Sequence, residues 1–242
     1  MTKKLATSKA PNSYSKAAEK IKEIIGLSWV DIPDASSYRG HGTAGRMIEF
    51  LLDLKENNND SPDLFDWEIK THGGGPSLIT LFHKEPEPQG IMNQMVHAYG
   101  WDDDKGRVSF RVTIEGKHKR GFYVTNEPDR VSVRHNGRDI LAVPFWTHNV
   151  LLGAAGAKLR RLILVDCEIN KTKKQIRYTG ATAYWEFNLT GFCDACEKGI
   201  VWIDFDARTS KGRGTALRNH GTKFRIKLSD IHLLYQNSRK IT

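Results

Sequence analysis

The stretch Ser61-Pro62-Asp63-Leu64-Phe65-Asp66-Trp67-Glu68-Ile69-Lys70-Thr71 gathers several carboxylates and one ammonium group around a predicted strand. Side chains of a strand alternate between its two faces, so Trp67 and Ile69 are expected to face the core. Glu68 and Lys70 then project together from the other face, and Asp63 lies just upstream. The stretch therefore predicts two acids and a lysine converging on one small patch.

Hydrolysis of a phosphodiester needs these residue types. Mg²⁺ prefers carboxylate oxygens, and such an ion activates water and stabilises the charge of the transition state. A lysine can orient or deprotonate the attacking water. Glu49 is the one acid in the apolar run 47–52, so we expect it to point toward the same patch. We therefore predict a Mg²⁺-dependent endonuclease with Glu49, Asp63, Glu68 and Lys70 as catalytic residues.

The surrounding pattern predicts an α/β (α+β) fold, a mixed sheet flanked by helices. Residues 1–16 lack periodicity and are expected to form a flexible tail. Turn-forming residues 72–76 separate the predicted strands 65–71 and 77–83. We further predict helices at 17–25, 45–55, 149–158, 190–198 and from 229 onward, and strands at 108–115, 121–125, 131–135, 140–145, 162–168, 176–187, 200–206 and 222–228.

Composition favours a polyanionic partner. The 242 residues include 37 Lys and Arg against 28 Asp and Glu, a formal net charge of +9. A surface of this sign attracts nucleic acid. Three cysteines are too few for a disulfide framework or a four-ligand zinc site, and we expect ordinary thiols. No signal peptide or long apolar stretch is present, so we expect no membrane partner and a cytoplasmic, prokaryotic intracellular protein.

Beyond these patterns, the order and intervals of Glu49, Asp63 and the run Glu68-Ile69-Lys70-Thr71-His72 resemble the MvaI/BcnI family of type II restriction endonucleases. That family is related to the strand-nicking repair enzyme MutH within the PD-(D/E)xK nucleases. Two further islands are similar to family segments: residues 78–86, and residues 219–226 with the preceding loop 210–212. The resemblance runs from about Gly45 to the end of the chain, more loosely over residues 101–158.

The resemblance implies a monomer with a two-lobed, C-shaped clamp around double-stranded DNA, here a single nuclease domain over residues 17–242. Its catalytic lobe would centre on about 40–100 and its DNA-reading segment on about 199–228. It further implies hydrolysis at a short CC-N-GG-type site with Mg²⁺, for which Mn²⁺ can substitute, 5′-phosphate ends, and a cognate DNA methyltransferase in the same system. By this resemblance Asp63 and Glu68 are metal ligands, Lys70 is the catalytic lysine and Glu49 supports the site. The residues that match base-reading positions are His83, Asp204, Lys223 and Arg225.

The chemistry of these side chains agrees with such roles, since Arg donates two hydrogen bonds to guanine and Asp accepts one from cytosine. Positioning contacts outnumber reading contacts, so Lys84, Lys211, Arg213 and His220 are expected to contact the DNA backbone. His83 matches the branch that prefers a central G/C pair, whereas Lys223 stands where that branch has a second histidine. The central base preference therefore stays open.

Two alternatives remain from the sequence. One is a MutH-like nickase or the catalytic module of a larger restriction protein. The other is a catalytically silent DNA-binding protein on a nuclease scaffold, against which the intact trio Asp63, Glu68 and Lys70 argues.

Overall fold

The structure is a computed structural model that describes residues 11–38, 40, 42–54, 63–74, 78–137, 143–212 and 214–241. It divides into two compact units. The first unit comprises Met1–Ile79, Gly156–Asn188 and Ile231–Thr242, and the second comprises Thr80–Ala155 and Leu189–Asp230. Strand β3, helix α4 and the 3-10 helix η2 run from one unit into the other along the chain.

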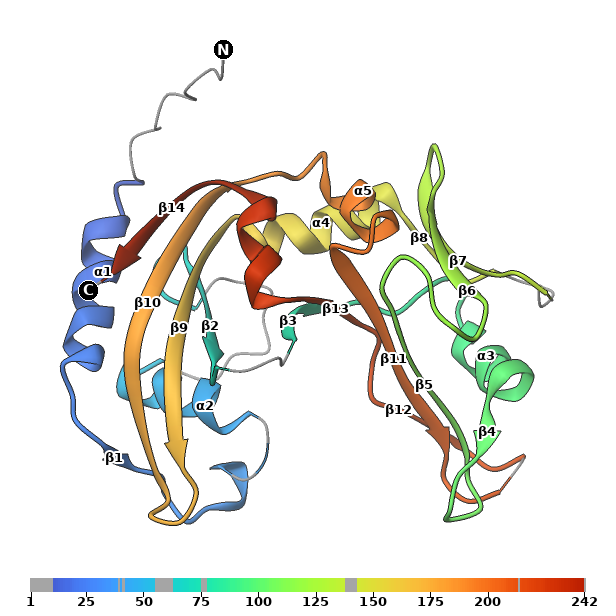
Figure 1. The fold of residues 1–242 in the computed structure, drawn as a ribbon, viewed down its shortest axis with the longest axis horizontal. Coiled ribbons are helices and arrows are strands. Elements are labelled where there is room, and N and C mark those ends of the chain that lie inside the picture. The colour runs from blue at the N-terminus through green and yellow to red at the C-terminus, as the bar shows by residue number, and fades with distance from the viewer. Residues whose placement is uncertain are drawn as a thin grey trace. The chain divides into compact units, whose positions relative to one another are not determined.

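The first unit is built on one mixed sheet in the order β1-β10-β9-β2, with β14 also paired to β10 (Figure 1). Strand β2 is parallel to β9, and the other pairings are antiparallel. On this path β2 is an edge strand, with β9 as its neighbour. The strands are β1 (Val30–Asp31), β2 (Glu68–His72), β9 (Arg161–Asn170), β10 (Gln175–Phe187) and β14 (Tyr235–Ile241).

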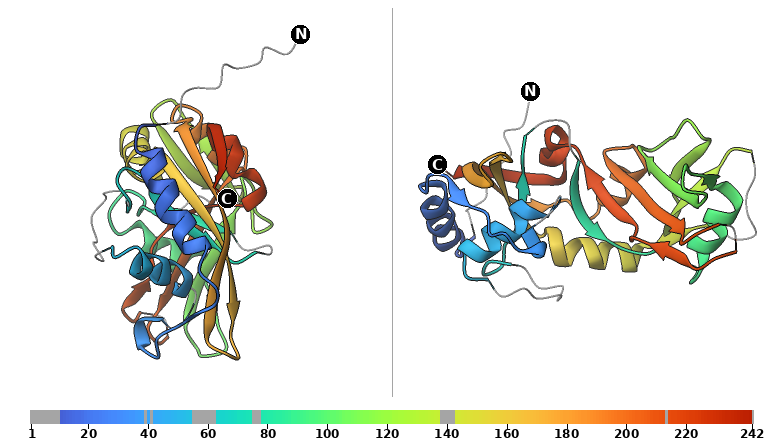
Figure 2. Two further views of the ribbon diagram at one scale, coloured as in Figure 1. Left: turned by 90° about the vertical axis from the view of Figure 1, so that its left-hand side faces the viewer. Right: turned by 90° about the horizontal axis from the view of Figure 1, so that it is seen from below.

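Helices cover this sheet and close its core. Helix α1 contacts β10 and β14 and lies along them (Figure 2), and α2 contacts β2. The core between them is apolar and includes Met47, Trp67, Ile163 and Trp185. The helical elements of this unit, with the two that enter from the second, are α1 (Tyr14–Ile25), η1 (Ser36–Tyr38), α2 (Thr43–Leu51), α4 (His148–Leu159) and η2 (Leu228–Leu234).

A tight turn precedes β2. Leu64 and Trp67 exchange two backbone hydrogen bonds of 2.9 Å, and Phe65 takes a positive φ of 57°. Asp66 within the turn accepts a hydrogen bond from the Ser13 hydroxyl and pairs with Arg161. The predicted strand 65–71 therefore begins later, at Glu68, because the chain must first reverse through this turn.

The second unit holds two sheets. The larger follows the order β3-β13-β11-β5-β4, with β12 paired to β11, and the smaller is β6-β7-β8. The strands of the larger sheet are β3 (Ile79–His83), β4 (Trp101–Asp102), β5 (Val108–Ile114), β11 (Val201–Thr209), β12 (Leu217–Asn219) and β13 (Lys223–Ile226). Those of the smaller are β6 (Phe122–Asn126), β7 (Arg130–His135) and β8 (Phe145–Thr147).

Aromatic side chains fill the core of the second unit. Phe82 stacks on Phe224 with ring centroids 4.8 Å apart, and Trp146 meets Phe224 edge to face at 5.2 Å. Helix α3 (Ile91–Tyr99) contacts β5 and β11, and α5 (Phe192–Glu197) contacts β6 and β11. The alternate positions of β11 that face this core, Val201, Ile203, Phe205 and Ala207, are fully buried.

The predicted mixed α+β class is confirmed, with differences at the ends of elements and with one helix, α3, that the sequence analysis did not predict. The predicted strand 140–145 lies partly outside the described residues, and β8 begins at Phe145. Helix α1 begins at Tyr14, inside the predicted tail 1–16, whose first ten residues lie outside the described ones. The predicted closing helix from Ser229 is wrong: a short 3-10 helix ends at Leu234, and β14 follows. The chain becomes a strand because Tyr235–Ile241 pairs with β10, a partner that local sequence does not reveal. Over the described residues, the helices are too short or too polar to cross a bilayer.

The close approach of Gly199 to the backbone of Glu115 in the second unit allows a stability prediction. Gly199 has φ +71°, and a Cβ there would lie 2.7 Å from the Glu115 carbonyl oxygen. Gly106 has a similar φ of +66° with nothing within 4 Å of its Cβ position. The Gly106→Ala variant should therefore lose only the cost of left-handed backbone, about 1–2 kcal/mol. Gly199→Ala should lose a further ~1–3 kcal/mol from overpacking against backbone.

Urea unfolding of the two variants and the wild type measures this difference. Equal destabilisation by the two substitutions would contradict the close approach of Gly199 to the Glu115 carbonyl oxygen.

Candidate active site

Strand β2 presents an acid and a lysine on one face. Glu68 is buried at 6% exposure, and Lys70 Nζ donates to Glu68 Oε1 at 3.0 Å. On the opposite face Trp67 and Ile69 are buried in the core, at 0% and 8% exposure. Because side chains alternate along the strand, the burial of Trp67 places the Glu68 carboxylate and the Lys70 ammonium together on the opposite face.

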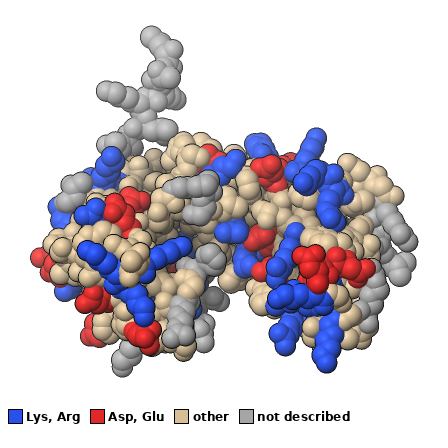
Figure 3. All heavy atoms as spheres, turned by 60° about the horizontal axis from the view of Figure 1, so that its bottom comes forward, with Lys and Arg blue, Asp and Glu red and all other residues tan. Residues whose placement is uncertain are grey.

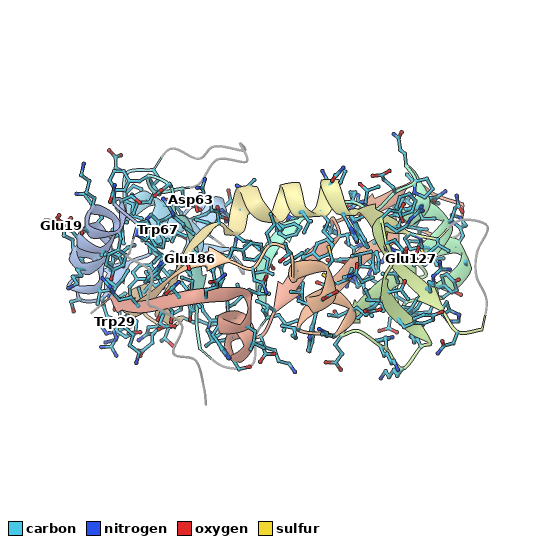
Figure 4. All side chains as sticks on the ribbon, turned by 90° about the horizontal axis from the view of Figure 1, so that it is seen from above. Glu19, Trp29, Asp63, Trp67, Glu127 and Glu186 are labelled. Carbon is cyan, nitrogen blue, oxygen red and sulfur yellow. The ribbon has the colours of Figure 1, made fainter. Side chains whose placement is uncertain are left out.

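Asp63 is held against the edge of β2 that faces away from β9. Its Oδ2 accepts a 2.9 Å hydrogen bond from the backbone N–H of Ile69. The N–H and C=O of one strand residue point to the same side, so the Ile69 carbonyl also faces away from β9. Figure 4 labels Asp63 and Trp67 in this unit. The edge therefore offers a carboxylate and a carbonyl oxygen next to the face that carries Glu68.

One oxygen of Glu68 lacks a hydrogen-bond partner. Oε2 is buried, and Lys158 Nζ on α4 lies 3.9 Å from it, beyond hydrogen-bond distance. Burial raises the pKa of Glu68, and the nearby Lys70 ammonium opposes that rise while Asp63 adds to it. The hydroxyl of Tyr235 is buried nearby without a hydrogen-bond partner, and burial together with Glu68 raises the pKa of this phenol.

This arrangement suits a divalent cation of the Mg²⁺ type. A buried carboxylate oxygen without a donor is an unsatisfied acceptor, which costs free energy unless something positive meets it. No group of three or more His, Cys, Asp or Glu that could hold a metal occurs among the residues that the structure describes. An ion here would depend on Asp63, Glu68, backbone oxygen and water, and Mg²⁺ characteristically keeps several waters.

Two other predicted or noted residues lie near this strand. Glu49 is half-buried on α2, and its charge adds to the effect of burial in raising the pKa of Tyr178. Its supporting role stays a prediction. His72 is buried, its Nδ1 accepts from the Gly74 N–H at 3.0 Å, and it interacts with Asp166. These contacts give His72 a structural role at the end of β2.

The second unit carries a face of paired charges. Asp204 and Arg225, from neighbouring strands β11 and β13, form an ion pair of 3.1 Å, and Thr113 donates to Asp204 at 2.8 Å. Lys223 pairs with Asp206 at 3.2 Å. Strand pairing places Asp204 opposite Lys223 and Trp202 opposite Arg225, and side chains two positions apart on a strand share a face. Figure 3 shows Lys, Arg, Asp and Glu side chains lying close together on the side of this unit turned to the viewer. Three predicted base-reading residues, Asp204, Lys223 and Arg225, thus lie on one face.

The remaining predicted DNA contacts lie around this sheet. His83 ends β3 and is exposed, as are Lys84, Lys211 and His220. The Lys84 N–H donates to the Thr222 carbonyl at 3.0 Å, so the end of β3 meets the start of β13. Arg213 lies outside the described residues.

Several residues of these sites escaped the sequence analysis. Asp206 and Arg208 follow Asp204 at intervals of two on β11, so strand alternation could have placed them on the same face. Arg111 pairs with Asp206 at 3.1 Å. Lys158 and Tyr235 reach Glu68 from elements distant in sequence, and no local pattern indicates either contact.

Comparisons with known proteins agree on one family. The sequence profile of the MvaI/BcnI restriction endonuclease family matches residues 18–235. Among solved structures, restriction endonuclease MvaI in complex with its cognate DNA substrate is similar with a TM-score of 0.80 and 25% identity, over 97% of this chain and 100% of that one. MvaI in the absence of DNA gives a TM-score of 0.57 and 24% identity, over 98% and 100%. Curated proteins yielded no match.

The profile covers most of the chain, and the edge strand that it includes carries the acids and lysine described above. This chain therefore belongs to the MvaI/BcnI restriction endonuclease family and is a type II site-specific nuclease.

Proposed function

We propose that this chain binds double-stranded DNA and hydrolyses it with Mg²⁺ at a short CC-N-GG-type site, leaving 5′-phosphate ends. The observation that carries the proposal is the buried Glu68 carboxylate, with one oxygen bonded to Lys70 and the other without a hydrogen-bond donor. A protein that only binds DNA has no use for such a destabilising group. The solved complex of MvaI with its cognate DNA supports DNA as the substrate.

The roles of the residues follow from their positions. Asp63 and Glu68 would hold the ion, and Asp63 is kept in place by the Ile69 N–H. Mg²⁺ at this point would acidify water and offset negative charge on the phosphate. Lys70 orients the attacking water and stabilises the charge that develops on the phosphate. Glu49 supports the site from α2, and Mn²⁺ would substitute for Mg²⁺.

We assign recognition of the DNA bases to the face of the second unit that carries the ion pairs Asp204–Arg225 and Asp206–Lys223. Arg225 has the planar fork that matches guanine, and Asp204 accepts from a cytosine amino group. His83 and Lys223 are proposed to read the central pair, whose identity is open. Lys84, Lys211, Arg213 and His220 are proposed to contact phosphates. We further propose a monomer that acts beside a cognate DNA methyltransferase.

Lysine removal provides the first test. Digestion of supercoiled plasmid by the wild type in Mg²⁺ should give discrete linear fragments whose ends, by run-off sequencing, map to one short motif. Lys70→Ala should cut slower by about 10²–10⁴-fold, because the attacking water loses its orienting group. Lys20→Ala, which removes an exposed lysine on α1, should cut like the wild type.

Open circles without linear product would instead indicate a nickase. Binding of one motif without cutting in Mg²⁺ or Mn²⁺ would indicate a silent binding protein, and inactivity without binding a need for a further domain.

The buried carboxylate makes a second prediction, on stability. Burial raises the pKa of Glu68 above its ordinary value of 4.5, so the folded chain holds this proton more tightly than the unfolded one. The ionised carboxylate therefore lowers stability as pH rises through that raised pKa. In EDTA, Glu68→Gln should be more stable than the wild type by roughly 0.5–2 kcal/mol at about pH 8, and the gain should shrink toward about pH 4.5.

Urea unfolding at the two pH values measures the difference, with exposed Glu23→Gln as the matched control. Adding Mg²⁺ should then stabilise the wild type and not Glu68→Gln. A variant less stable than the wild type at the higher pH would contradict the cost assigned to Glu68.

Arginine removal tests recognition. Arg225→Ala should weaken binding of the cognate duplex by ~1–3 kcal/mol, since two hydrogen bonds to guanine are lost. Arg225→Lys keeps the positive charge beside Asp204 but not the planar fork, so it should lose a similar amount while non-specific binding stays unchanged. Titrations in Ca²⁺ with cognate and random duplexes measure both. Full cognate affinity in Arg225→Lys would remove Arg225 from base reading.

A further inference from the structure

Glu85, which follows β3 and Lys84, accepts hydrogen bonds from the segment that links β12 to β13. Glu85 Oε2 accepts a 2.6 Å hydrogen bond from the side-chain amide of Asn219, and Oε1 accepts a 2.7 Å bond from the backbone N–H of Thr222. Both carboxylate oxygens are thus engaged by one short segment, residues 219–222. These residues all belong to the second unit (Figure 1).

The segment itself is a turn that lies in van der Waals contact with Glu85. Gly221 has φ +87°, and its N–H donates to Asn219 Oδ1 at 3.0 Å. A Cβ on Gly221 would lie 3.6 Å from Glu85 Oε1. Thr222 is fully buried and accepts from the Lys84 N–H, while the His220 N–H donates to the Asp206 carbonyl at 2.8 Å. The two bonds from Glu85 therefore complete a turn whose backbone is held on several sides.

The turn leads directly into the proposed reading strand. Lys223 is the first residue of β13, and Arg225 stands two positions later on the same face. A shift of Thr222 would shift the start of β13 and with it both side chains. Base reading needs donors placed within a fraction of an ångström of their acceptors.

The charge of Glu85 argues against a role in affinity. Lys84 adjoins it in sequence, and on this unit a DNA backbone would be repelled by an extra carboxylate. A negative group that opposes DNA binding, yet is fully hydrogen-bonded to one turn, is explained by what it holds in place. Glu85 also lines a cavity of about 730 Å³ together with His83, Asn93 and Asn219, so the turn is open to approach on this side.

We propose that Glu85 is a positioning residue for sequence discrimination, acting through Asn219 and Thr222 on the start of β13. This inference rests on the proposed function, because it assigns Glu85 to the same DNA-reading face. It predicts that loss of the carboxylate harms discrimination while non-specific affinity stays the same or rises.

A donor–acceptor exchange tests the pair. Glu85→Gln sets an amide N–H₂ against that of Asn219, whose Oδ1 is already held by Gly221. Asn219→Asp sets two carboxylates against each other. The double variant lets the amide at position 85 donate to the carboxylate at position 219 and restores the wild-type net charge of the pair. Gly221 can keep its acceptor in all of these variants.

The readout is the ratio of kcat/KM for the selected site to that for a duplex with one base pair changed. Each single variant should lose about tenfold or more of this ratio, the effect of one misplaced hydrogen-bonding group, and the double variant should regain most of it. Binding of a duplex without the site, measured in Ca²⁺, should be equal or tighter in Glu85→Gln. Thermal unfolding of the variants, compared with the wild type, checks the fold.

The possible results distinguish failure of the proposed function from failure of the role assigned to Glu85. If the wild type selects no motif from a random duplex library, the proposed function is wrong and this inference fails with it. A wild type with a clear motif and a Glu85→Gln variant with unchanged discrimination would overturn the inference alone. Equal loss of specific and non-specific binding, or a double variant no better than the singles, would likewise overturn it, since Glu85 would then be a general support.

Discussion

The burial of the Glu68 carboxylate is the constraint on which the rest of the first unit depends. A charged group at 6% exposure, with one oxygen lacking a hydrogen-bond donor, is held there at a cost in stability. The fold sustains that cost by placing the neighbouring Trp67 fully inside the core, since strand alternation then leaves Glu68 no other direction. Lys70 and Lys158 reduce the cost without removing it, because burial still raises the pKa of Glu68.

The two units arrange their charged side chains differently. In the first, Asp63 lies at the edge of β2 that faces away from β9, and the buried Glu68 has one oxygen without a hydrogen-bond partner. In the second, Asp204 and Asp206 each meet a cationic side chain from β13 across the sheet, and Arg208 Nε on the same face is buried without a hydrogen-bond partner. The first arrangement suits metal-assisted hydrolysis, because a carboxylate oxygen without a hydrogen-bond donor is available to a cation at one point. The second suits recognition, which requires groups that are rigid before the partner arrives.

Local sequence was sufficient where one strand carried the information. The alternation of Trp67, Glu68, Ile69 and Lys70 predicted which side chains are buried in the core and which share the other face, as the structure shows. It was insufficient where a distant partner decides the outcome. β14 was predicted as helix because its pairing with β10 is non-local, and Lys158 reaches Glu68 by tertiary packing alone.

Under the base-reading roles proposed for Arg225 and Asp204, the ion pair between them gives a physical route to discrimination. In the free chain the two side chains meet at 3.1 Å, with Thr113 as a further donor to Asp204. A base edge must therefore compete with contacts that already exist. The correct pair offers acceptors to Arg225 and a donor to Asp204 together, so it can compensate both groups at once. A wrong pair compensates one group or neither, and leaves a desolvated charge that costs more than the contact it gained. Pairing before binding thus turns a modest gain for the right sequence into a larger penalty for the wrong one.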